Sequence, residues 1–356
     1  MMMDFNRTQE QQMALENLRK FLDAEVEPAF LEHGEGFIPR DKMQAWVQQF
    51  TDFGMIKAPH DEQWGGFGMD WLTHLMVFEE IAYTSLDLAI PGFINCVGAE
   101  MLSEPDVGSD VAAVKTRAVR DGDHWVINGE KTWITNGEYS DLFICTCKTG
   151  ENEISHILID REEHGYDVMG IKKLALNGQS TAQVFMSDVR VPVSNTLGDL
   201  GQGLKNTMKL FEYARCHMSM WGIAVARRAL DESIKYSQER SQHGKPIAGH
   251  QLIADKIATM ATHIDAARLL TYRAISLVES GIRADKECSM AKWYGTEIAV
   301  TATRDAVEIH GGNGVTKEFV VERLAREAIV SPIPDGTTEI QKLLIARCLT
   351  GIQAFR

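Results

Sequence analysis

The sequence predicts an α+β fold, mainly α, in which a β-layer separates two helical parts. Two changes in the spacing of apolar residues support this prediction. The spacing is helical from Thr8 to about Ile94, has a period of two from about Met101 to Val193, and is helical again from Gly203 onward. We therefore expect three domains, which are an N-terminal helical domain over residues 1–100, a β-domain over 101–200 and a helix bundle over 201–356.

The first part has two apolar stripes at helical spacing. Their members are Leu15, Leu18, Phe21 and Leu22 in one stripe, and Leu72, Leu75, Met76 and Ile81 in the other. Pro28 and the glycine-rich run at 65–68 are expected to interrupt the helices.

The middle part is typical of a small antiparallel barrel or sandwich. Its β-rich runs are Trp125–Ile127, Leu142–Cys147, Ile157–Ile159 and Val184–Met186. The dipeptides Asp121-Gly122 and Asn128-Gly129 both predict hairpin turns.

The last part has long helices that we expect to form a bundle. Its apolar seam is Ile253, Ile257, Met260, Ile264 and Ala267. The run at 311–314 is expected to end one helix, and Pro332 and Pro334 the next. Either Thr337 or Thr338 can cap a final helix that reaches Arg347.

Net charge, apolar runs and the absence of known motifs argue against several kinds of partner and site. The net charge of −14 argues against nucleic acid and anionic membrane surfaces as partners, and no stretch of about 18 apolar residues could span a membrane. No Rossmann fingerprint, phosphate loop or His-Glu-x-x-His motif occurs. With no secretory pattern we expect a reduced, cytoplasmic protein without a metal site. Its cysteines, which lack metal-ligand spacing, are Cys96, Cys145, Cys147, Cys216, Cys288 and Cys348.

Two segments carry a family resemblance. Ser-Glu-Pro-Asp-Val-Gly-Ser-Asp at 103–110 and Trp-Ile-Thr-Asn-Gly at 133–137 resemble the two best-known signatures of the acyl-CoA dehydrogenase family of flavoproteins. The resemblance continues almost end to end. It implies FAD as cofactor and the acyl-CoA dehydrogenase fold, with an N-terminal helical domain, a middle antiparallel β-domain and a C-terminal four-helix bundle.

The resemblance implies flavin contacts in both the β-domain and the bundle. Ser103, with the backbone of Leu102, falls where the family binds the pyrimidine end of the isoalloxazine, and Thr135 falls where a hydroxyl faces flavin N5. Trp133 falls where an aromatic side chain packs on the ring, although a lone tryptophan is more often a core residue. The complete set is Leu102, Ser103, Trp133, Ile134, Thr135, Arg240, Gln242, His243, Gln251, Glu308, Gly311, Gly312, Thr337 and Glu339.

Within that set, the segment at 240–245 resembles an Arg-x-x-Phe-Gly motif that reaches FAD across a subunit interface in the family. His243 stands where the motif has Phe. An arginine such as Arg240 suits a diphosphate because it forms bidentate charge-assisted bonds.

Substrate contacts are also implied by the resemblance. Ser109 corresponds to a residue on the pantetheine side and Arg215 to one near the CoA nucleotide; Glu212 and Gly336 complete the set. Taken alone, a helical arginine is usually a solvated or ion-paired surface group. Thr84 occupies the place of an arginine found in glutaryl-type members, which argues against a dicarboxylic acyl chain.

The base is expected to be Asp335. Most relatives have Glu in a Tyr-Glu-Gly-Thr segment, and here Ile-Pro-Asp-Gly-Thr occupies 333–337. Asp is one methylene shorter, and a misplacement of about 1 Å can cost on the order of 100-fold in rate. A second branch of the family places its Glu at the position of Ala214, so that route is closed here and Glu212, two residues away, is a weak substitute. Asp87 is another weak alternative, which could face the pocket if the shortened region folds inward. Asp335 could instead merely cap an Asp-Gly turn.

One departure from the family lies between Ser85 and Ser103. Relatives carry a further helical stretch there that helps to close the acyl pocket, whereas Ile90-Pro91-Gly92 here leads directly to the β-layer. We expect a shortened N-terminal domain, either as a trimmed variant or because a segment is missing from the chain.

Together these features predict an FAD-dependent acyl-CoA dehydrogenase of fatty-acid or carboxylic-acid catabolism. A carboxylate would take the α-proton, the β-hydride would pass to flavin N5, and the product would be the trans-2-enoyl-CoA. The resemblance implies an electron-transfer flavoprotein as acceptor and a homotetramer built on the bundle. Two alternatives remain, a nitroalkane-oxidase-like flavoprotein oxidase, whose base is an Asp, and a non-catalytic FAD-binding member of the family.

Overall fold

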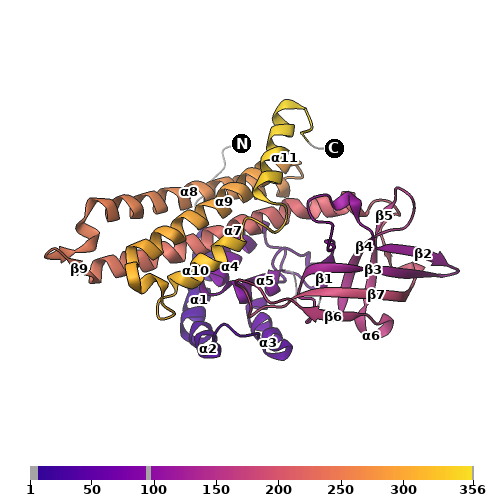
Figure 1. Cartoon of the computed structure of the whole chain (residues 1–356), viewed down its shortest axis with the longest axis horizontal. Coiled ribbons are helices and arrows are strands. Elements are labelled where there is room, and N and C mark those ends of the chain that lie inside the picture. Colours follow the sequence, from indigo (N-terminus) through magenta and orange to yellow (C-terminus); the bar gives the residue numbers. More distant parts are fainter. Residues whose placement is uncertain (1–6, 94–97, 355–356) are drawn as a thin grey trace. The chain divides into compact units, whose positions relative to one another are not determined.

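The computed structural model describes residues 7–93 and 98–354. Contacts divide the chain into two compact units (Figure 1). We call Met1–Leu31, Lys57–Leu86 and Phe211–Arg356 the helical unit, and Glu32–Ile56 with Asp87–Leu210 the β unit. The expected order of a helical part, a β-part and a helical part is confirmed, and the three domain boundaries stay a prediction. Ile94 and Cys96 lie outside the described residues, and the other five cysteines are free thiols.

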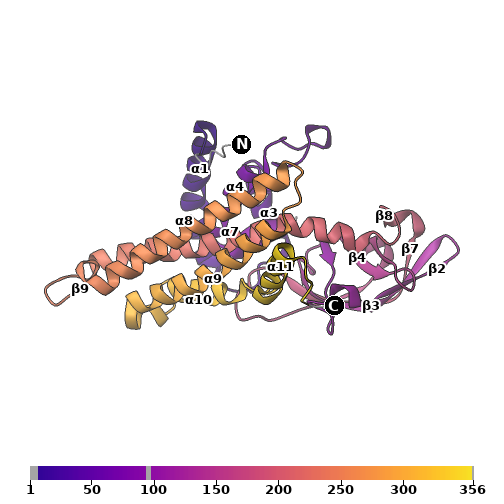
Figure 2. The ribbon, with the colours of Figure 1, turned by 90° about the horizontal axis from the view of Figure 1, so that it is seen from above.

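The helical unit is dominated by three long helices that run alongside one another (Figures 1 and 2). Its elements are α1 (Gln9–Phe21), most of α2 (Glu27–His33), α4 (Trp71–Thr84), most of α7 (Gly203–Glu239), α8 (Gln251–Glu279), α9 (Asp285–His310), α10 (Val321–Val330) and α11 (Thr338–Thr350). Pro28 does not break the chain into separate helices, because a π-helical turn at Leu22–Val26 joins α1 to α2. Thr337 caps α11 by accepting a hydrogen bond from the Ile340 amide.

The β unit is built on one eight-stranded sheet, with a main hydrophobic core and a smaller cluster of Val107, Val114 and Ile154. Its strands are β1 (Gly98–Met101), β2 (Arg117–Asp121), β3 (His124–Thr135), β4 (Leu142–Lys148), β5 (Ile154–Asp160), β6 (Asp167–Gly170), β7 (Thr181–Pro192) and β8 (Thr196–Leu197). They are ordered β6-β7-β3-β2-β4-β5-β8, and β1 pairs with β4. The same unit contains three helices, which are α3 (Arg40–Thr51), α5 (Leu86–Phe93, whose first residue belongs to the helical unit) and α6 (Arg161–His164). All four predicted β-rich runs lie on strands.

Two expectations about this sheet were wrong in detail. The sheet is not purely antiparallel, because β1 enters from the N-terminal part and pairs parallel to β4. Asp121-Gly122 does turn the β2–β3 hairpin, but Asn128-Gly129 lies inside β3 at a bulge. The Asn128 side chain bonds Asp188 on β7, and a Cβ at Gly129 would collide with Thr116. Close backbone approach, not a turn, therefore requires this glycine.

A buried carboxylate joins three helices of the helical unit. Glu79 on α4 is 0% exposed and accepts hydrogen bonds from Arg227 on α7 (2.7 Å) and Arg268 on α8 (2.9 Å). Burial alone would raise the pKa of Glu79, but Arg227 and Arg268 outweigh burial and lower that pKa to about 2. The ionised carboxylate is therefore part of the folded state at neutral pH.

Replacing Glu79 tests this junction. Glu79→Gln should lower the free energy of unfolding at pH 7 by about 3 kcal/mol, because it removes the buried anion that Arg227 and Arg268 share. A lowered pKa contributes stability above the unfolded value of 4.5 that disappears as the pH falls toward 2, so the deficit should shrink over that range. Urea unfolding followed by circular dichroism measures it.

Asp265→Asn is the matched control. Asp265 bonds the same Arg268 but its side chain is 78% exposed, so the change should stay within about 0.5 kcal/mol. Equal effects of the two substitutions would contradict the role given to Glu79.

Candidate active site

Two segments of the β unit that are far apart in sequence lie side by side. The Thr132 amide donates to the Ser103 carbonyl (3.0 Å), and the Lys131 ammonium donates to the Leu102 carbonyl (3.0 Å). This pairing brings half-buried Ser103 close to the segment that carries Trp133 and half-buried Thr135. The two sequence signatures therefore form one surface.

Trp133 is not a core residue. Its side chain is 62% exposed, and its backbone has φ +62°, in the left-handed region that non-glycine residues rarely adopt. A register shift between Lys131 and Ile134 in the β3–β7 pairing accompanies this conformation. Such strain costs on the order of 1–3 kcal/mol and persists where the surroundings impose it, often at functional sites. An exposed aromatic ring beside two hydroxyl groups fits a planar ligand with a polar edge.

Two predicted flavin contacts face inward instead. Ile134 belongs to the core of the β unit, and Leu102 is also buried. Their side chains are therefore unavailable, and only their backbone groups could contact a ligand.

Lys131 holds the first signature in place. Its ammonium is fully buried and donates to Glu104 Oε1 (2.9 Å) and the Thr146 carbonyl (2.7 Å), besides Leu102. Glu104 also accepts the amides of Lys115 (2.6 Å) and Thr116 (2.9 Å). Burial raises the pKa of Glu104, but Lys131 and these bonds outweigh it, so the pKa is lowered.

Sequence reasoning missed Lys131, although a signal existed. In strand β3 the inward residues Trp125 and Ile127 share odd numbering with Lys131, so the alternation places its side chain on the core face.

Asp87 and Ser109 occupy different environments in the β unit. Asp87 is buried, and its Oδ1 accepts the Gln179 amide (3.0 Å). Gly178 packs against Asp87 so closely that a Cβ there would come within 2.7 Å of Asp87 Cγ. Asp87 thus holds the 178–179 segment, and its role as a base stays an untested alternative. Ser109 lies exposed in the loop before the 3₁₀ turn at Val111–Ala113.

In the helical unit, Asp335 lies in the loop between α10 and α11. Its backbone is left-handed (φ +54°), and Gln341 Nε2 donates to the carbonyls of Asp335 (3.0 Å) and Gly336 (2.9 Å). Among residues 7–93 and 98–354, no hydrogen-bond partner of the Asp335 carboxylate is found. Asp335 lies in a turn, and the cap of α11 is Thr337. Burial raises the pKa of Asp335, and Lys292 and Arg215 oppose that rise only in part.

Arg215 on α7 is buried, contrary to the usual surface position of a helical arginine. It is 4% exposed, and its Nη1 lies 3.8 Å from Asp285 Oδ1. Its Nε and Nη1 have no hydrogen-bond partner within the described part of the chain. Burial lowers the pKa of Arg215, while Asp285 and Asp335 oppose this effect. Glu212, one helical turn earlier, accepts the Ala284 amide (2.9 Å) before α9.

The remaining predicted cofactor residues lie at three places in the helical unit. Arg240, Gln242 and His243 lie at the exposed hairpin of β9 (Ser241–Gln242) and β10 (Lys245–Pro246), where His243 and Gly244 both have positive φ, and exposed Gln251 begins α8. At the end of α9, Glu308 pairs with Lys256 of α8 (2.6 Å), and Gly311 (φ +60°) and Gly312 begin a 3₁₀ turn that ends the helix as expected. Thr337 and exposed Glu339 lie instead at the start of α11, which Figure 1 shows far along the bundle from the β9 hairpin.

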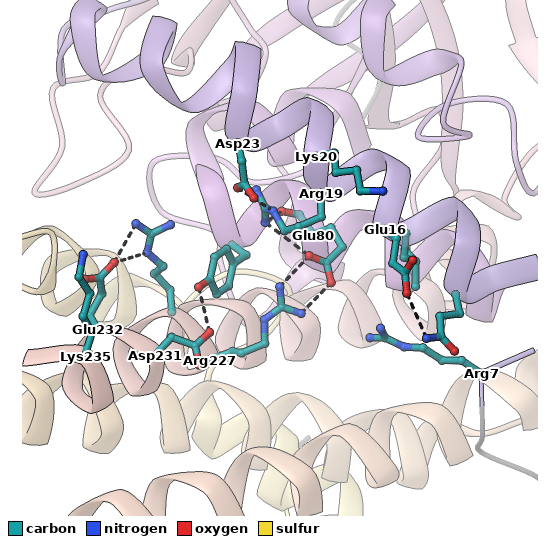
Figure 3. Close-up of a pocket in the computed structure, with 14 residues that line it drawn as sticks. Arg7, Glu16, Arg19, Lys20, Asp23, Glu80, Arg227, Asp231, Glu232 and Lys235 are labelled. Atoms are coloured by element: carbon teal, nitrogen blue, oxygen red, sulfur yellow. Dashed lines mark hydrogen bonds and ion pairs between the residues drawn. The ribbon is translucent and has the colours of Figure 1, made fainter. Parts of the chain in front are cut away.

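A pocket of about 940 Å³ in the helical unit contains none of these residues (Figure 3). It is lined by charged side chains of α1, α4 and α7, which largely pair with one another, as Arg227 does with Glu80 and Tyr83 with Asp231.

In the described ranges no group of His, Cys, Asp and Glu could hold a metal ion. Among the described helices, none is both long enough and apolar enough to cross a membrane.

The Lys131 contacts generate a test of the first signature. Lys131→Met should lower the free energy of unfolding by about 3 kcal/mol, since it leaves Glu104 charged and buried, and it should reduce the flavin retained on purification. Lys115→Met removes only an exposed ion pair with Asp106 in the same loop and should cost less than about 1 kcal/mol. Urea unfolding and the visible absorbance of bound flavin measure both effects; similar losses in the two variants would refute the assignment.

Comparison with known proteins adds independent evidence. Three family models match the chain: acyl-CoA dehydrogenase N-terminal domain over residues 8–105, middle domain over 99–189, and C-terminal domain over 201–350. The solved butyryl-CoA dehydrogenase of Megasphaera elsdenii is similar at 28% identity and a TM-score of 0.92, covering 98% of this chain and 100% of that one.

Curated relatives agree. A probable acyl-CoA dehydrogenase, YngJ, of Bacillus subtilis is 34% identical, covering 98% of this chain and all of its own length. Subunit CarC of the caffeyl-CoA reductase–Etf complex of Acetobacterium woodii is 36% identical, with 93% and 96% covered. The alignment to YngJ extends over 388 positions, more than the 356 residues of this chain, so the relative carries residues with no counterpart here. The chain therefore belongs to the acyl-CoA dehydrogenase family and is a flavin oxidoreductase that acts on CH–CH bonds.

Proposed function

We propose that this enzyme uses FAD to oxidise the Cα–Cβ bond of an acyl-CoA thioester to the trans-2-enoyl-CoA, with Asp335 as the base. The observation that carries this proposal is the state of Asp335. Its half-buried carboxylate is uncommitted to other described groups and lies near two cationic side chains, Lys292 and Arg215. A base must offer a free lone pair to the proton that it removes, and this carboxylate does.

Asp335 acts on the α-proton in this proposal. Its raised pKa makes proton abstraction more favourable than it would be for an exposed aspartate, while Lys292 and Arg215 keep the carboxylate form accessible. FAD, when bound, would accept the β-hydride at N5, and Thr135 falls at the position facing that atom in the family.

The β unit supports the binding of FAD. Trp133 offers an exposed ring, and Ser103 and Thr135 offer half-buried hydroxyls; Leu102 and Ile134, whose side chains are buried, are assigned to FAD through their backbone alone. In the helical unit, we assign Thr337, Glu339 and Gly336 to the flavin and substrate near the base. Ser109, Glu212 and Arg215 are assigned to the acyl-CoA.

The residues far along the bundle support an oligomer. Arg240, Gln242, His243, Gln251, Glu308, Gly311 and Gly312 lie at the β9 hairpin, the start of α8 and the end of α9. Figure 1 shows the β9 hairpin far along the bundle from α11, which is consistent with contact to FAD of a neighbouring copy. Exposed apolar residues on the same unit, such as Leu252 at 79%, are also consistent with burial in a homotetramer.

An electron-transfer flavoprotein is the proposed acceptor. The similarity to CarC, a subunit of a complex that is named for its Etf component, supports this partner. Thr84, in place of a glutaryl-type arginine, is a buried residue that accepts a hydrogen bond from Arg19, so it favours monocarboxylic acyl groups.

A nitroalkane-oxidase-like oxidase is the second candidate, because its base is also an aspartate. Arg215 Nε and Nη1, which are buried and have no hydrogen-bond partner among the described residues, favour an anionic thioester ligand over a small nitroalkane. A non-catalytic FAD-binding role is disfavoured by the free carboxylate of Asp335.

Anaerobic mixing with a panel of acyl-CoAs tests the proposed reaction. The oxidised flavin absorbance should bleach, and Asp335→Asn should slow bleaching by about 100- to 10,000-fold without loss of bound flavin. Because only the carboxylate can take the proton and its pKa is raised, the wild-type rate should fall with decreasing pH around a midpoint above 3.8. Bleaching by nitroalkanes alone would favour the second candidate, and undiminished bleaching by Asp335→Asn would exclude Asp335 as the base.

Trp133 offers a separate test of the flavin surface. Trp133→Gly should leave the thermal stability of the apoprotein unchanged or higher, since glycine tolerates φ +62°, and should weaken FAD binding about tenfold through loss of ring packing. Trp125→Gly, in the core of the same strand, should instead unfold the β unit. Scanning fluorimetry and FAD titration measure these effects; a destabilised Trp133→Gly variant with normal FAD affinity would contradict the assignment.

A further inference from the structure

We propose that Lys292 is a positioning residue, whose buried ammonium clamps the loop at 332–336 and thereby sets where the Asp335 carboxylate stands. This inference rests on the proposed function, because it concerns the group that takes the α-proton. Lys292 lies on α9, far in sequence from the loop, and none of the sequence motifs includes it.

The clamp consists of two short hydrogen bonds. Lys292 Nζ donates to the Pro332 carbonyl (2.6 Å) and to the Gly336 carbonyl (2.7 Å), which precede and follow Asp335. The Lys292 side chain is 0% exposed, and a lysine is almost never buried to this extent unless its charge is matched. Its two acceptors fix both sides of the segment that presents the base.

A second buried side chain completes the arrangement. Gln341, on α11, donates to the carbonyls of Asp335 and Gly336. The loop is therefore held from α9 and from α11, and both sets of bonds end on backbone atoms. They leave the Asp335 carboxylate itself uncommitted.

The clamp also maintains an unfavourable backbone. Asp335 has φ +54°, a left-handed conformation that aspartate tolerates better than most residues but that still costs free energy, and Gly336 follows with φ +93°. Release of the two carbonyls would let the loop relax toward ordinary conformations. The carboxylate would then move with it.

Precise placement matters more for Asp than for the Glu of most relatives. The shorter side chain has one fewer rotatable bond, so it cannot compensate for a displaced backbone. By fixing the backbone on both sides of Asp335, Lys292 limits the displacement of a carboxylate that cannot correct its own position.

The charge of Lys292 has a second effect on Asp335. Lys292 carries the only buried ammonium described near the loop, and its positive charge favours the carboxylate form of Asp335. Burial, the largest influence, lowers the pKa of Lys292 to about 8, while Asp335 opposes this. Arg215 is the other cation that faces Asp335, and Glu297 and Glu339 are further acidic groups that act on Lys292.

Two substitutions separate clamp from charge. Lys292→Met removes both, and should lower the anaerobic bleaching rate constant by about 100-fold while the half-saturating acyl-CoA concentration changes little. Lys292→Gln keeps hydrogen-bond donors without charge and should recover part of that rate. In both variants the acid limb of the pH–rate profile should move to higher pH, because the cation that favours ionised Asp335 is gone.

Lys286→Met is the matched control. Lys286 is on the same helix, is partly exposed and pairs with Glu287, so its loss should change neither rate nor pH profile. Circular dichroism and flavin content report folding in every variant.

The outcomes are distinguishable. Failure of wild-type enzyme to bleach with any acyl-CoA would refute the proposed function. If the wild type bleaches but Lys292→Met and Lys292→Gln keep its rate and pH profile, the clamp is refuted. Unfolding of both variants would also overturn the proposal, since Lys292 would then be a structural residue.

Discussion

A lysine ammonium that is shut off from water must donate its N–H groups to acceptors inside the protein, because an unmatched buried charge is strongly destabilising. In each unit a buried lysine meets this requirement by donating to backbone carbonyls, and Lys131 donates to a carboxylate as well. In the β unit, Lys131 reaches Leu102, Glu104 and Thr146; in the helical unit, Lys292 reaches Pro332 and Gly336. Each lysine thus fixes backbone carbonyls next to residues assigned to the flavin or to the base. Structural stability and the geometry of the proposed chemistry depend on the same contacts.

The order of helical and β parts could be predicted from sequence because it depends on local periodicity. The spacing of apolar residues changes where the helices give way to strands and again where helices return, and each predicted β-rich run lies on a strand. Local patterns failed where a distant partner decided the outcome. Asn128-Gly129 has the composition of a hairpin turn, but Asp188 and Thr116 occupy both sides of it, so it lies within strand β3, opposite a bulge in β7. The parallel pairing of β1 with β4 likewise depends on a connection longer than any turn signal.

Much of the candidate site was predictable as segments but not as an arrangement. The signatures around Ser103 and Trp133 were visible in sequence, and the structure joins them through Thr132 and Ser103. The left-handed backbone of Trp133 carried no signal, since tryptophan rarely adopts that region, whereas the Asp335-Gly336 dipeptide is a turn signal and aspartate is enriched there. Lys292 could have been noticed, because it lies on the buried stripe of α9 with Cys288 and Gly295. Its partners could not, because they lie 40 and 44 residues away.

Asp335 is the carboxylate that we propose meets the substrate, and Glu212 and Asp87 are the alternatives. Both of those carboxylates accept backbone amides, from Ala284 and Gln179, whereas Asp335 accepts none among the described residues. A crystal structure with FAD and an acyl-CoA bound tests this difference most directly. We expect a carboxylate oxygen of Asp335 within about 3 Å of the thioester α-carbon, on the side of the proton that is removed. A complex in which Glu212, Asp87 or another carboxylate occupies that place would contradict it.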